Sequence, residues 1–388
     1  MPKQLISRRA FAAAATGGCA GLQTLPAQTA GRSERLKITK IELFKVVVLM
    51  QNDINSSPEM SGDDLSEFPK TPKHILKVHT DSGIVGIGET ARGVREPDLR
   101  RNIDYLTGKN IFDLNLTNLD LPYRREYAGF EIALYDAVGK AVGRPVYWLL
   151  GGLAQRKVLV NYWCARKNPV DIKRVAQRAV AGKFNGIKMK AFPGDPVVKA
   201  VESIASVSSA LKVTVDTEGQ FKSAADFLPI GRGLDAVGNM RVIEDPVAKK
   251  NMEGFIALRK QLKTPLALHQ GDPRELIRFI RADACDIFNT GPSPSMASFV
   301  ANCYLAGAAG KPVWHGSGHE LGILDAAMLH SCAAAPNCTL PSDILSFQRV
   351  DDLIVKPIDI RDSYAHVSDA PGLGLELDED AVRRYKVA

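Results

Sequence analysis

From residue 158 onward, short apolar segments alternate with amphipathic segments. The apolar, β-rich runs are eight in number: 158–164, 186–191, 212–217, 241–246, 265–270, 284–290, 312–315 and 338–343. Segments with helical periodicity lie between them, for example 171–181, 196–211, 274–281 and 295–309. Such alternation is typical of parallel βαβ units. Eight β-rich runs favour a closed (β/α)-barrel over an open sheet.

The segment that precedes these units has a different pattern. Its strand-like and helical runs are 37–48, 73–79, 84–87, 99–105 and 130–142. The three strand-like runs predict an antiparallel meander, and the helices make the region an α+β module. We therefore expect a capping domain over 35–150 and a barrel domain over 151–365. The last stretch, 366–388, is expected to fold back onto the capping domain.

Composition and charge narrow the class of protein. The chain has 388 residues, of which 45% are hydrophobic and 24% are charged, as in an ordinary soluble globular protein of two domains. Its formal net charge of +7 includes three basic residues of the N-terminal leader, which leaves +4 without them. No basic tract or RNA-binding aromatic pattern occurs, so nucleic acid is not an expected partner. Cys332 and Cys338 could pair in an oxidising compartment, although buried free thiols are the simpler interpretation.

The first residues carry a targeting pattern. Ser7-Arg8-Arg9-Ala10-Phe11 is a twin-arginine motif, a small and weakly apolar stretch follows it, and no acid occurs before Glu34. This order predicts a twin-arginine signal peptide over 1–30 and export to the periplasm. The apolar run is too short for a stable membrane span. Cys19 weakly resembles a lipoprotein cleavage site, and the sequence leaves its lipidation open.

Polar residues end the predicted barrel strands, where the active site of such a barrel lies. They are Lys188, Lys190, Asp216, Glu218, Glu244, Asp245, His269, Gln270, Asp272, Asn289 and His315. Taken singly, each has a structural explanation as a helix cap or a core residue. Together they place carboxylates, lysines and histidines at one barrel mouth. Oxygen ligands from successive strands suit a hard cation such as Mg²⁺, and a neighbouring lysine can serve as a general base.

Motifs in both predicted domains support a family resemblance. They lie at 83–89, 131–140, 149–152 and 372–380, and they accompany the strand ends described above. In this order they resemble the enolase superfamily, and within it the mandelate racemase and muconate lactonizing enzyme branch. The resemblance covers nearly the whole chain after the leader. It implies a modified (β/α)7β TIM barrel with an N-terminal α+β capping domain, a Mg²⁺ cofactor, a small-molecule carboxylate substrate and a homo-oligomer.

The resemblance also implies a role for individual residues. Lys190 matches the strand-2 base and Lys188 its electrostatic partner, while Asp216 and Glu244 match the first two metal ligands. His315 matches the base that faces the substrate from the opposite side. In the implied mechanism Mg²⁺ holds the substrate carboxylate while Lys190 or His315 removes the α-proton. A β-hydroxyl group then leaves, or the proton returns on the other face.

Two positions depart from the family pattern. The third metal ligand should be an acid on strand 5, at His269 or Gln270, and neither is acidic. His269 could coordinate through nitrogen, or Asp272 could reach in from the loop, and either change favours Mn²⁺ or a softer metal. On strand 6, Gly291 stands where the family has an Asp or a Lys, so His315 lacks its usual partner.

Three functions remain open from the sequence. The leading hypothesis is a lyase that dehydrates a hydroxy acid such as a sugar acid. The second is a racemase or epimerase with the same two bases, and the third is a degenerate barrel that binds a ligand without turnover. His319 and Glu320 could replace the missing strand-6 partner, although the pattern assigns them to a loop or helix. We expect substrate identity to depend on the 51–68 loop and on the region near Ser342 and Asp343.

Overall fold

The computed structural model describes residues 35–62, 68–121, 126–291 and 295–387. The predicted signal peptide over 1–30, including Cys19, lies outside the described residues. Among the helices of the described part, none has both the length and the apolarity needed to cross a bilayer.

The N-terminal domain is built on an antiparallel sheet in the order β1-β2-β3, as predicted. Its strands are β1 (Ile38–Leu49), β2 (Lys70–Thr80) and β3 (Val85–Glu89), and its helices are α1 (Glu96–Leu106), α2 (Tyr127–Val142) and α3 (Val146–Leu149). Helix α2 packs against β3 over two glycines. A Cβ atom at Gly86 would lie 2.0 Å from the Ala133 carbonyl oxygen, and one at Gly88 would lie 2.0 Å from the Gly129 carbonyl oxygen. The glycines therefore allow the helix backbone to approach the sheet closely.

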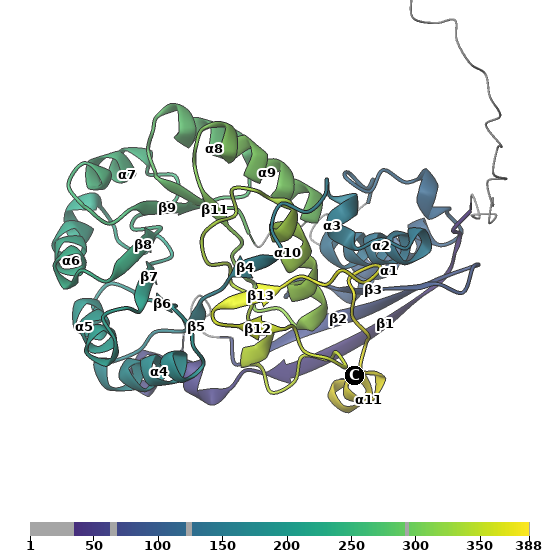
Figure 1. The fold of residues 1–388 in the computed structure, drawn as a ribbon, viewed down its shortest axis with the longest axis horizontal. Helices are drawn as coiled ribbons and strands as arrows, with labels where there is room; N and C mark the ends of the chain where they lie inside the picture. The colour runs from purple at the N-terminus through teal and green to yellow at the C-terminus, as the bar shows by residue number, and fades with distance from the viewer. Residues whose placement is uncertain (1–34, 63–67, 122–125, 292–294, 388) are drawn as a thin grey trace, which may run out of the picture. The chain divides into compact units, whose positions relative to one another are not determined.

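The barrel contains seven parallel strands in the order β11-β10-β9-β8-β7-β6-β5. They are β5 (Tyr162–Cys164), β6 (Gly186–Lys190), β7 (Lys212–Asp216), β8 (Met240–Glu244), β9 (Leu266–His269), β10 (Ile287–Asn289) and β11 (Val313–Trp314). The helices between and after them are α4 (Pro169–Ala181), α5 (Val197–Val207), α6 (Ala224–Val237), α7 (Met252–Arg259), α8 (Pro273–Arg281), α9 (Met296–Ala308) and α10 (Gly322–Ala334). Figure 1 shows α4 to α9 outside the strands. Consecutive strands are neighbours throughout, as parallel βαβ units require.

The first and last predicted barrel strands differ from the prediction. Only the end of the run 158–164 joins the barrel as β5, because β4 (Lys157–Leu159) pairs with β13 (Tyr364–His366), which also pairs with β12 (Ile360–Arg361). The run 338–343 forms two isolated parallel bridges, Val313 to Cys338 and Val160 to Ser342. These bridges connect the last strand to the first and close the ring.

The C-terminal residues contact the N-terminal domain. Helix α11 (Glu379–Tyr385) lies against β1, and a bridge joins Val46 to Lys386. The backbone N–H of Leu373 donates to Asp136 of α2 at 2.9 Å. Residues 366–387 are therefore held by both the first strand and the main helix of that domain.

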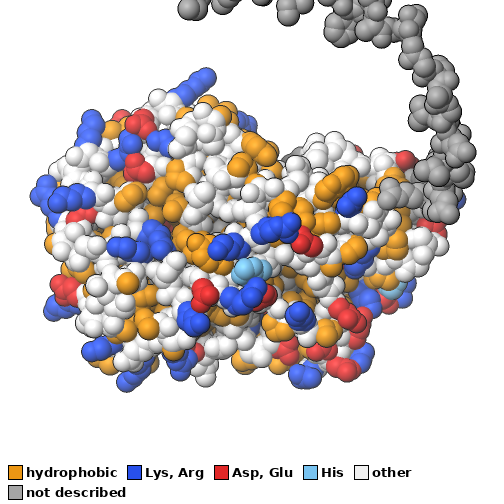
Figure 2. Space-filling model, in the orientation of Figure 1, with side chains coloured by type: hydrophobic (Ala, Val, Ile, Leu, Met, Phe, Trp, Pro, Cys, Tyr) orange, Lys and Arg blue, Asp and Glu red, His pale blue; other side chains and the backbone are white. Residues whose placement is uncertain are grey.

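The cysteines and the surface add two observations. Cys332 and Cys338 are buried free thiols, so they do not form the disulfide that the sequence left open. On the face shown in Figure 2, Lys and Arg side chains are interspersed with Asp and Glu side chains. The charge on this face is distributed rather than concentrated.

Candidate active site

A cavity of about 360 Å³ lies at the carboxyl ends of the barrel strands. Its polar lining comes mainly from the strand ends: Lys188, Lys190, Asp216, Glu218, His269, Asn289 and Asp343. The rest comes from the N-terminal domain, β5 and the segments around α10: Phe68, Ala91, Arg92, Ala128, Trp163, Ser317, Gly318, His319, Glu320, Leu324 and Leu345. The cavity therefore has a charged floor under a largely apolar and aromatic cover.

The two lysines of β6 lie on the floor and are buried by carboxylates. Lys188 Nζ is 2.8 Å from both Glu244 Oε2 and Asp343 Oδ2, and Lys190 Nζ is 2.6 Å from Asp216 Oδ2. Lys190 also contacts Glu218. Burial alone would lower the pKa of each lysine, but the surrounding carboxylates outweigh it and raise both pKa values. Both side chains are therefore ammonium groups in this arrangement.

The carboxylates of β7 and β8 have opposite electrostatic surroundings. Burial acts to raise the pKa of Asp216, but Lys190 and Lys188 overcome it and lower that pKa. Burial, together with the charge of Asp216, raises the pKa of Glu244 to about 8, despite Lys188. Burial likewise raises the pKa of Asp245 to about 7, although the positive charge of Lys249 acts to lower it. Burial therefore disfavours the ionised forms of Glu244 and Asp245, the charge of Asp216 adds to this effect, and a further positive charge would favour ionisation.

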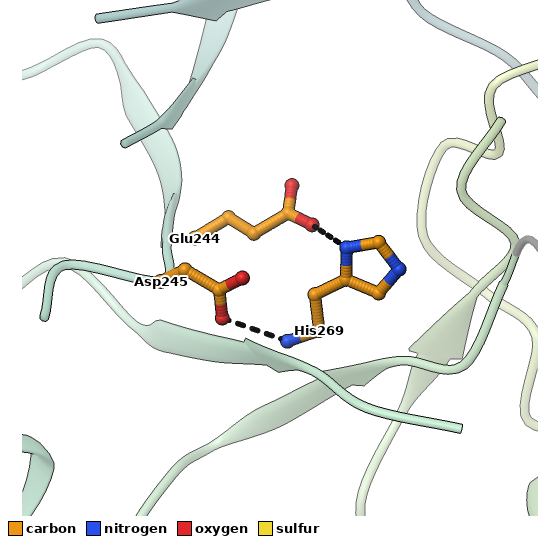
Figure 3. A group of neighbouring side chains, drawn as sticks. All are labelled: Glu244, Asp245 and His269. Carbon is orange, nitrogen blue, oxygen red and sulfur yellow. Dashed lines mark hydrogen bonds and ion pairs between the residues drawn. The ribbon is translucent and has the colours of Figure 1, made fainter. Parts of the chain in front are cut away.

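Three side chains at the ends of β8 and β9 could bind a metal ion. Ligand atoms of Glu244, Asp245 and His269 all lie within 4.8 Å of one another. Figure 3 shows Glu244 directed toward the His269 ring, with the Asp245 carboxylate beside them. The Asp216, Glu218 and Asp245 carboxylates form a second such group. Asp245 belongs to both.

Asp245 is not among the metal ligands predicted from the sequence. In a regular strand its side chain would point away from that of Glu244. Its φ of 47° is left-handed, and its Oδ1 accepts the backbone N–H of His269 at 2.9 Å. The consecutive acids Glu244 and Asp245 at the end of β8 were the available signal.

The charge balance fits a divalent cation. Among the described residues, five carboxyl groups around the floor face three ammonium groups, and a bound cation would favour the ionised forms of Glu244 and Asp245, whose pKa values are raised by burial. One buried oxygen of each acid, Glu244 Oε2 and Asp245 Oδ2, forms no hydrogen bond among the described residues and has a lysine ammonium group as its nearest charged neighbour, at 2.8 Å and 3.2 Å. Carboxylate oxygens with one imidazole form a donor set for Mg²⁺, Mn²⁺ or Zn²⁺.

The other two predicted metal ligands, Gln270 and Asp272, form hydrogen bonds to the backbone instead. Gln270 Oε1 accepts the backbone N–H of Asp272 at 3.0 Å, and Asp272 Oδ1 accepts that of Arg274 at 2.9 Å. Asp272 is thus the N-cap of α8, with a half-exposed side chain. Neither residue joins a group of potential metal ligands, because both side chains form the turn between β9 and α8.

His315 does not line the cavity. Its Nδ1 is 2.6 Å from the Gly316 carbonyl oxygen, its ring packs on Phe299 with centroids 4.4 Å apart, and burial lowers its pKa to about 4. A Cβ atom at Gly291 would lie 2.4 Å from His315 Nδ1. The ring therefore fills the space that a side chain at position 291 would need, which corrects the predicted placement of this base.

His319 occupies the cavity instead. Its ring centroid lies 4.0 Å from that of Phe68 and 4.4 Å from that of Trp163. Its Nδ1 is buried and has no hydrogen-bond partner among the described residues. Burial, reinforced by Arg349 and other cations, holds its pKa well below the ordinary value. His319 is therefore a neutral imidazole at the active-site cavity.

Comparison with known proteins establishes the family. A family model described as enolase C-terminal domain-like matches residues 171–381. The chain belongs to this family. The fold predicted by the resemblance to the enolase superfamily, a modified TIM barrel with a capping domain, is thereby confirmed.

Relatives in the superfamily carry different activities. The chain is 28% identical over 344 residues to D-galactonate dehydratase of Variovorax paradoxus, with 79% of this chain and 89% of the relative covered. It is 24% identical over 389 residues to N-succinyl-L-Arg/Lys racemase of Bacillus cereus, with 91% and 98% covered. The structure of muconate lactonizing enzyme from Pseudomonas fluorescens complexed with muconolactone has a TM-score of 0.79 and 23% identity, covering 91% of this chain and 100% of that one. The chain is thus a member of the enolase superfamily, and its relatives there include lyases and isomerases.

Proposed function

We propose that the protein removes the α-proton of a carboxylate substrate with the help of a divalent cation, and dehydrates a hydroxy acid such as a sugar acid. The observation that carries the proposal is the meeting of a potential metal group, two buried ammonium groups and a neutral histidine at one cavity. Relatives in the superfamily that include a D-galactonate dehydratase support it.

The cation is proposed to be Mg²⁺, or Mn²⁺ in view of the imidazole. Glu244, Asp245 and His269 would hold it, with Asp216 nearby. When bound, it would neutralise the substrate carboxylate and stabilise the negative charge that develops as the α-proton leaves. Lys188, fixed between Glu244 and Asp343, would add a positive charge on the same side of the site.

His319 and Lys190 provide the two proton-transfer groups. The neutral imidazole would accept the α-proton, and the Lys190 ammonium would give a proton to the β-hydroxyl group, which leaves as water. From a 2,3-dihydroxy acid, loss of the α-hydrogen and the β-hydroxyl group leaves an enol that keeps the α-hydroxyl group, and this enol becomes the 2-keto acid. His319 thus takes the role that the family resemblance implied for His315.

A racemase or epimerase is the second candidate. It would use the same pair, because one neutral base and one protonated acid also suffice to remove a proton from one face and return one to the other. The relationship to N-succinyl-L-Arg/Lys racemase favours it.

Product analysis separates the candidates. The mature protein would be incubated with a panel of hydroxy acids and N-acylated amino acids, with and without Mg²⁺ or Mn²⁺. Formation of a 2-keto acid supports dehydration, and inversion of the α-carbon supports racemisation. If neither metal binds at millimolar concentration and no acid is turned over, the protein is a non-catalytic binding barrel and the proposal is wrong.

A further inference from the structure

A buried ammonium group lies in the capping domain, behind the cavity. Lys73 of β2 has a fully buried side chain. Its Nζ is 3.2 Å from Glu89 Oε1 and 3.6 Å from Glu320 Oε1. A buried ammonium group is costly unless anions surround it, and here one carboxylate comes from each domain. Lys73 therefore connects the capping domain to the segment that carries His319.

Both carboxylates hold the backbone on either side of His319. Glu89 Oε1 accepts the N–H of Leu321 at 2.8 Å, and Glu89 Oε2 accepts that of Leu324 at 2.9 Å, at the start of α10. Glu320 Oε2 accepts the hydroxyl of Ser317, whose oxygen in turn accepts the His319 N–H at 2.8 Å. The two acids thus determine where the turn over 317–321 lies.

A second cation completes this arrangement. Arg349 donates to the carbonyl oxygens of Val48 in β1 at 2.8 Å, of Glu320 at 3.1 Å, and of His319. His319 has a φ of 67°, a conformation that residues other than glycine keep only when their surroundings impose it. Contacts from β1, β2 and β3 together supply that constraint.

We propose that Lys73 is a positioning residue of the active site, which keeps the His319 imidazole in place by bridging Glu89 and Glu320. The inference rests on the proposed function, in which His319 accepts the substrate proton. Without the ammonium group, two buried carboxylates would lose the cation that bridges them, because Arg349 donates to backbone carbonyl oxygens of this segment. Glu320 would then move, and the Ser317–His319 turn would move with it.

The test replaces Lys73 with a side chain of similar length but no charge. In K73M, kcat should fall about 10- to 100-fold with KM nearly unchanged, because a small displacement of a proton-transfer group impairs chemistry more than binding. In the double variant K73M/E320Q one of the two facing carboxylate charges is also removed, so its kcat should be about fivefold or more higher than that of K73M. K77M is the matched control, since Lys77 is on the same strand and pairs with Glu379 at the surface. It should leave kcat unchanged.

A readout independent of turnover accompanies the kinetics. Histidine labelled with ¹³C at Cε1 gives one signal for each of the seven histidines, and H319N identifies that of His319. K73M should shift or broaden this signal, K73M/E320Q should restore it in part, and K77M should not affect it. If folded K73M keeps the wild-type His319 signal and the wild-type kcat, the inference is wrong.

The inference can still be tested if the wild-type protein is inactive or if K73M does not fold. If the wild-type protein turns over no acid, the proposed function fails and the His319 signal alone decides the inference. If K73M does not fold, E320Q removes the same ion pair from the other partner at nearly constant volume. A wild-type His319 signal and kcat in E320Q would then overturn the inference, and the changes described for K73M would support it.

Discussion

The ring of His315 lies over the α-carbon of Gly291, where a Cβ atom would come within 2.4 Å of Nδ1. The lack of an acid at position 291 and the absence of His315 from the cavity lining therefore have one structural cause, because the His315 ring occupies the space of a side chain at position 291. The glycine allows the imidazole to turn into the barrel wall, where it contacts Phe299 and the Gly316 carbonyl oxygen. In the proposed mechanism His319 has the proton-transfer role instead.

A methyl group at position 291 should therefore destabilise the protein. G291A should reduce the free energy of unfolding by about 1–3 kcal/mol, the usual effect of overpacking. G271A is the control, because the nearest atom to a Cβ at Gly271 is 3.8 Å away. Urea denaturation measures both variants. Equal stability of G291A and the wild-type protein would show that the His315 ring is elsewhere.

Replacement of the two histidines should have unequal effects on activity. H319N should reduce kcat about 10²- to 10⁴-fold, the usual contribution of a general acid or base. H315N should reduce kcat less than about tenfold, because its imidazole does not reach the cavity. Steady-state kinetics at saturating substrate compare them. The reverse order would restore His315 as the base.

Metal affinity should depend on Asp245. D245N should weaken Mn²⁺ binding about tenfold or more, at least as much as loss of an outer-shell partner. K249M should strengthen it, because Lys249 Nζ lies 3.2 Å from Asp245 Oδ2 and competes for that oxygen. D272N is the control and should bind as the wild type does. Titration followed by electron paramagnetic resonance gives these affinities without turnover. A weakened D272N with an unchanged D245N would move the third ligand to Asp272.

Stability should fall in mild acid because of buried histidines. Burial lowers the pKa of His315 and His330 to about 4 from an ordinary value of 6.5. Between these values the unfolded chain binds the proton and the folded chain does not, so the free energy of unfolding rises from pH 4 to 6.5 and is then constant for these groups. Each histidine contributes a slope of up to about 1.4 kcal/mol per pH unit.

The variant H330N should remove one such contribution. Its unfolding free energy should depend less on pH than that of the wild type between pH 4.5 and 6.5, as measured by urea denaturation. H366N, at a half-buried position, is the control. A slope in H330N equal to that of the wild type would show that His330 titrates normally.

The sequence predicted the barrel and the capping sheet because their patterns are local. Alternating strands and helices, and glycines such as Gly86 and Gly88, directly reflect packing. It also identified the lysines and acids that the structure gathers at the ends of β6, β7 and β8. The local backbone conformation at Asp245 and His319 could not be predicted from the sequence. The left-handed φ of Asp245 and of His319 redirects each side chain, and no periodicity rule gives such a turn.

The choice of base and third ligand depends on contacts distant in sequence. His319 is held by Phe68, Trp163 and Arg349, which come from three separate segments. Asp272 looked like a potential ligand because of its residue type, but it caps α8. A helix cap and a metal ligand have the same composition, so only the structure distinguishes them.

The most direct test of proton abstraction is hydrogen exchange at the substrate α-carbon. The mature protein would be incubated in D₂O with Mn²⁺ and a panel of carboxylic acids, and deuterium at the α-carbon and in products would be measured by NMR and mass spectrometry. We predict that at least one acid incorporates deuterium or forms a 2-keto acid with the wild-type protein and with H315N. H319N should lose both reactions, and K190M should no longer form the 2-keto acid. An absence of exchange and product with every acid while Mn²⁺ is bound, or full exchange in H319N, would contradict the account.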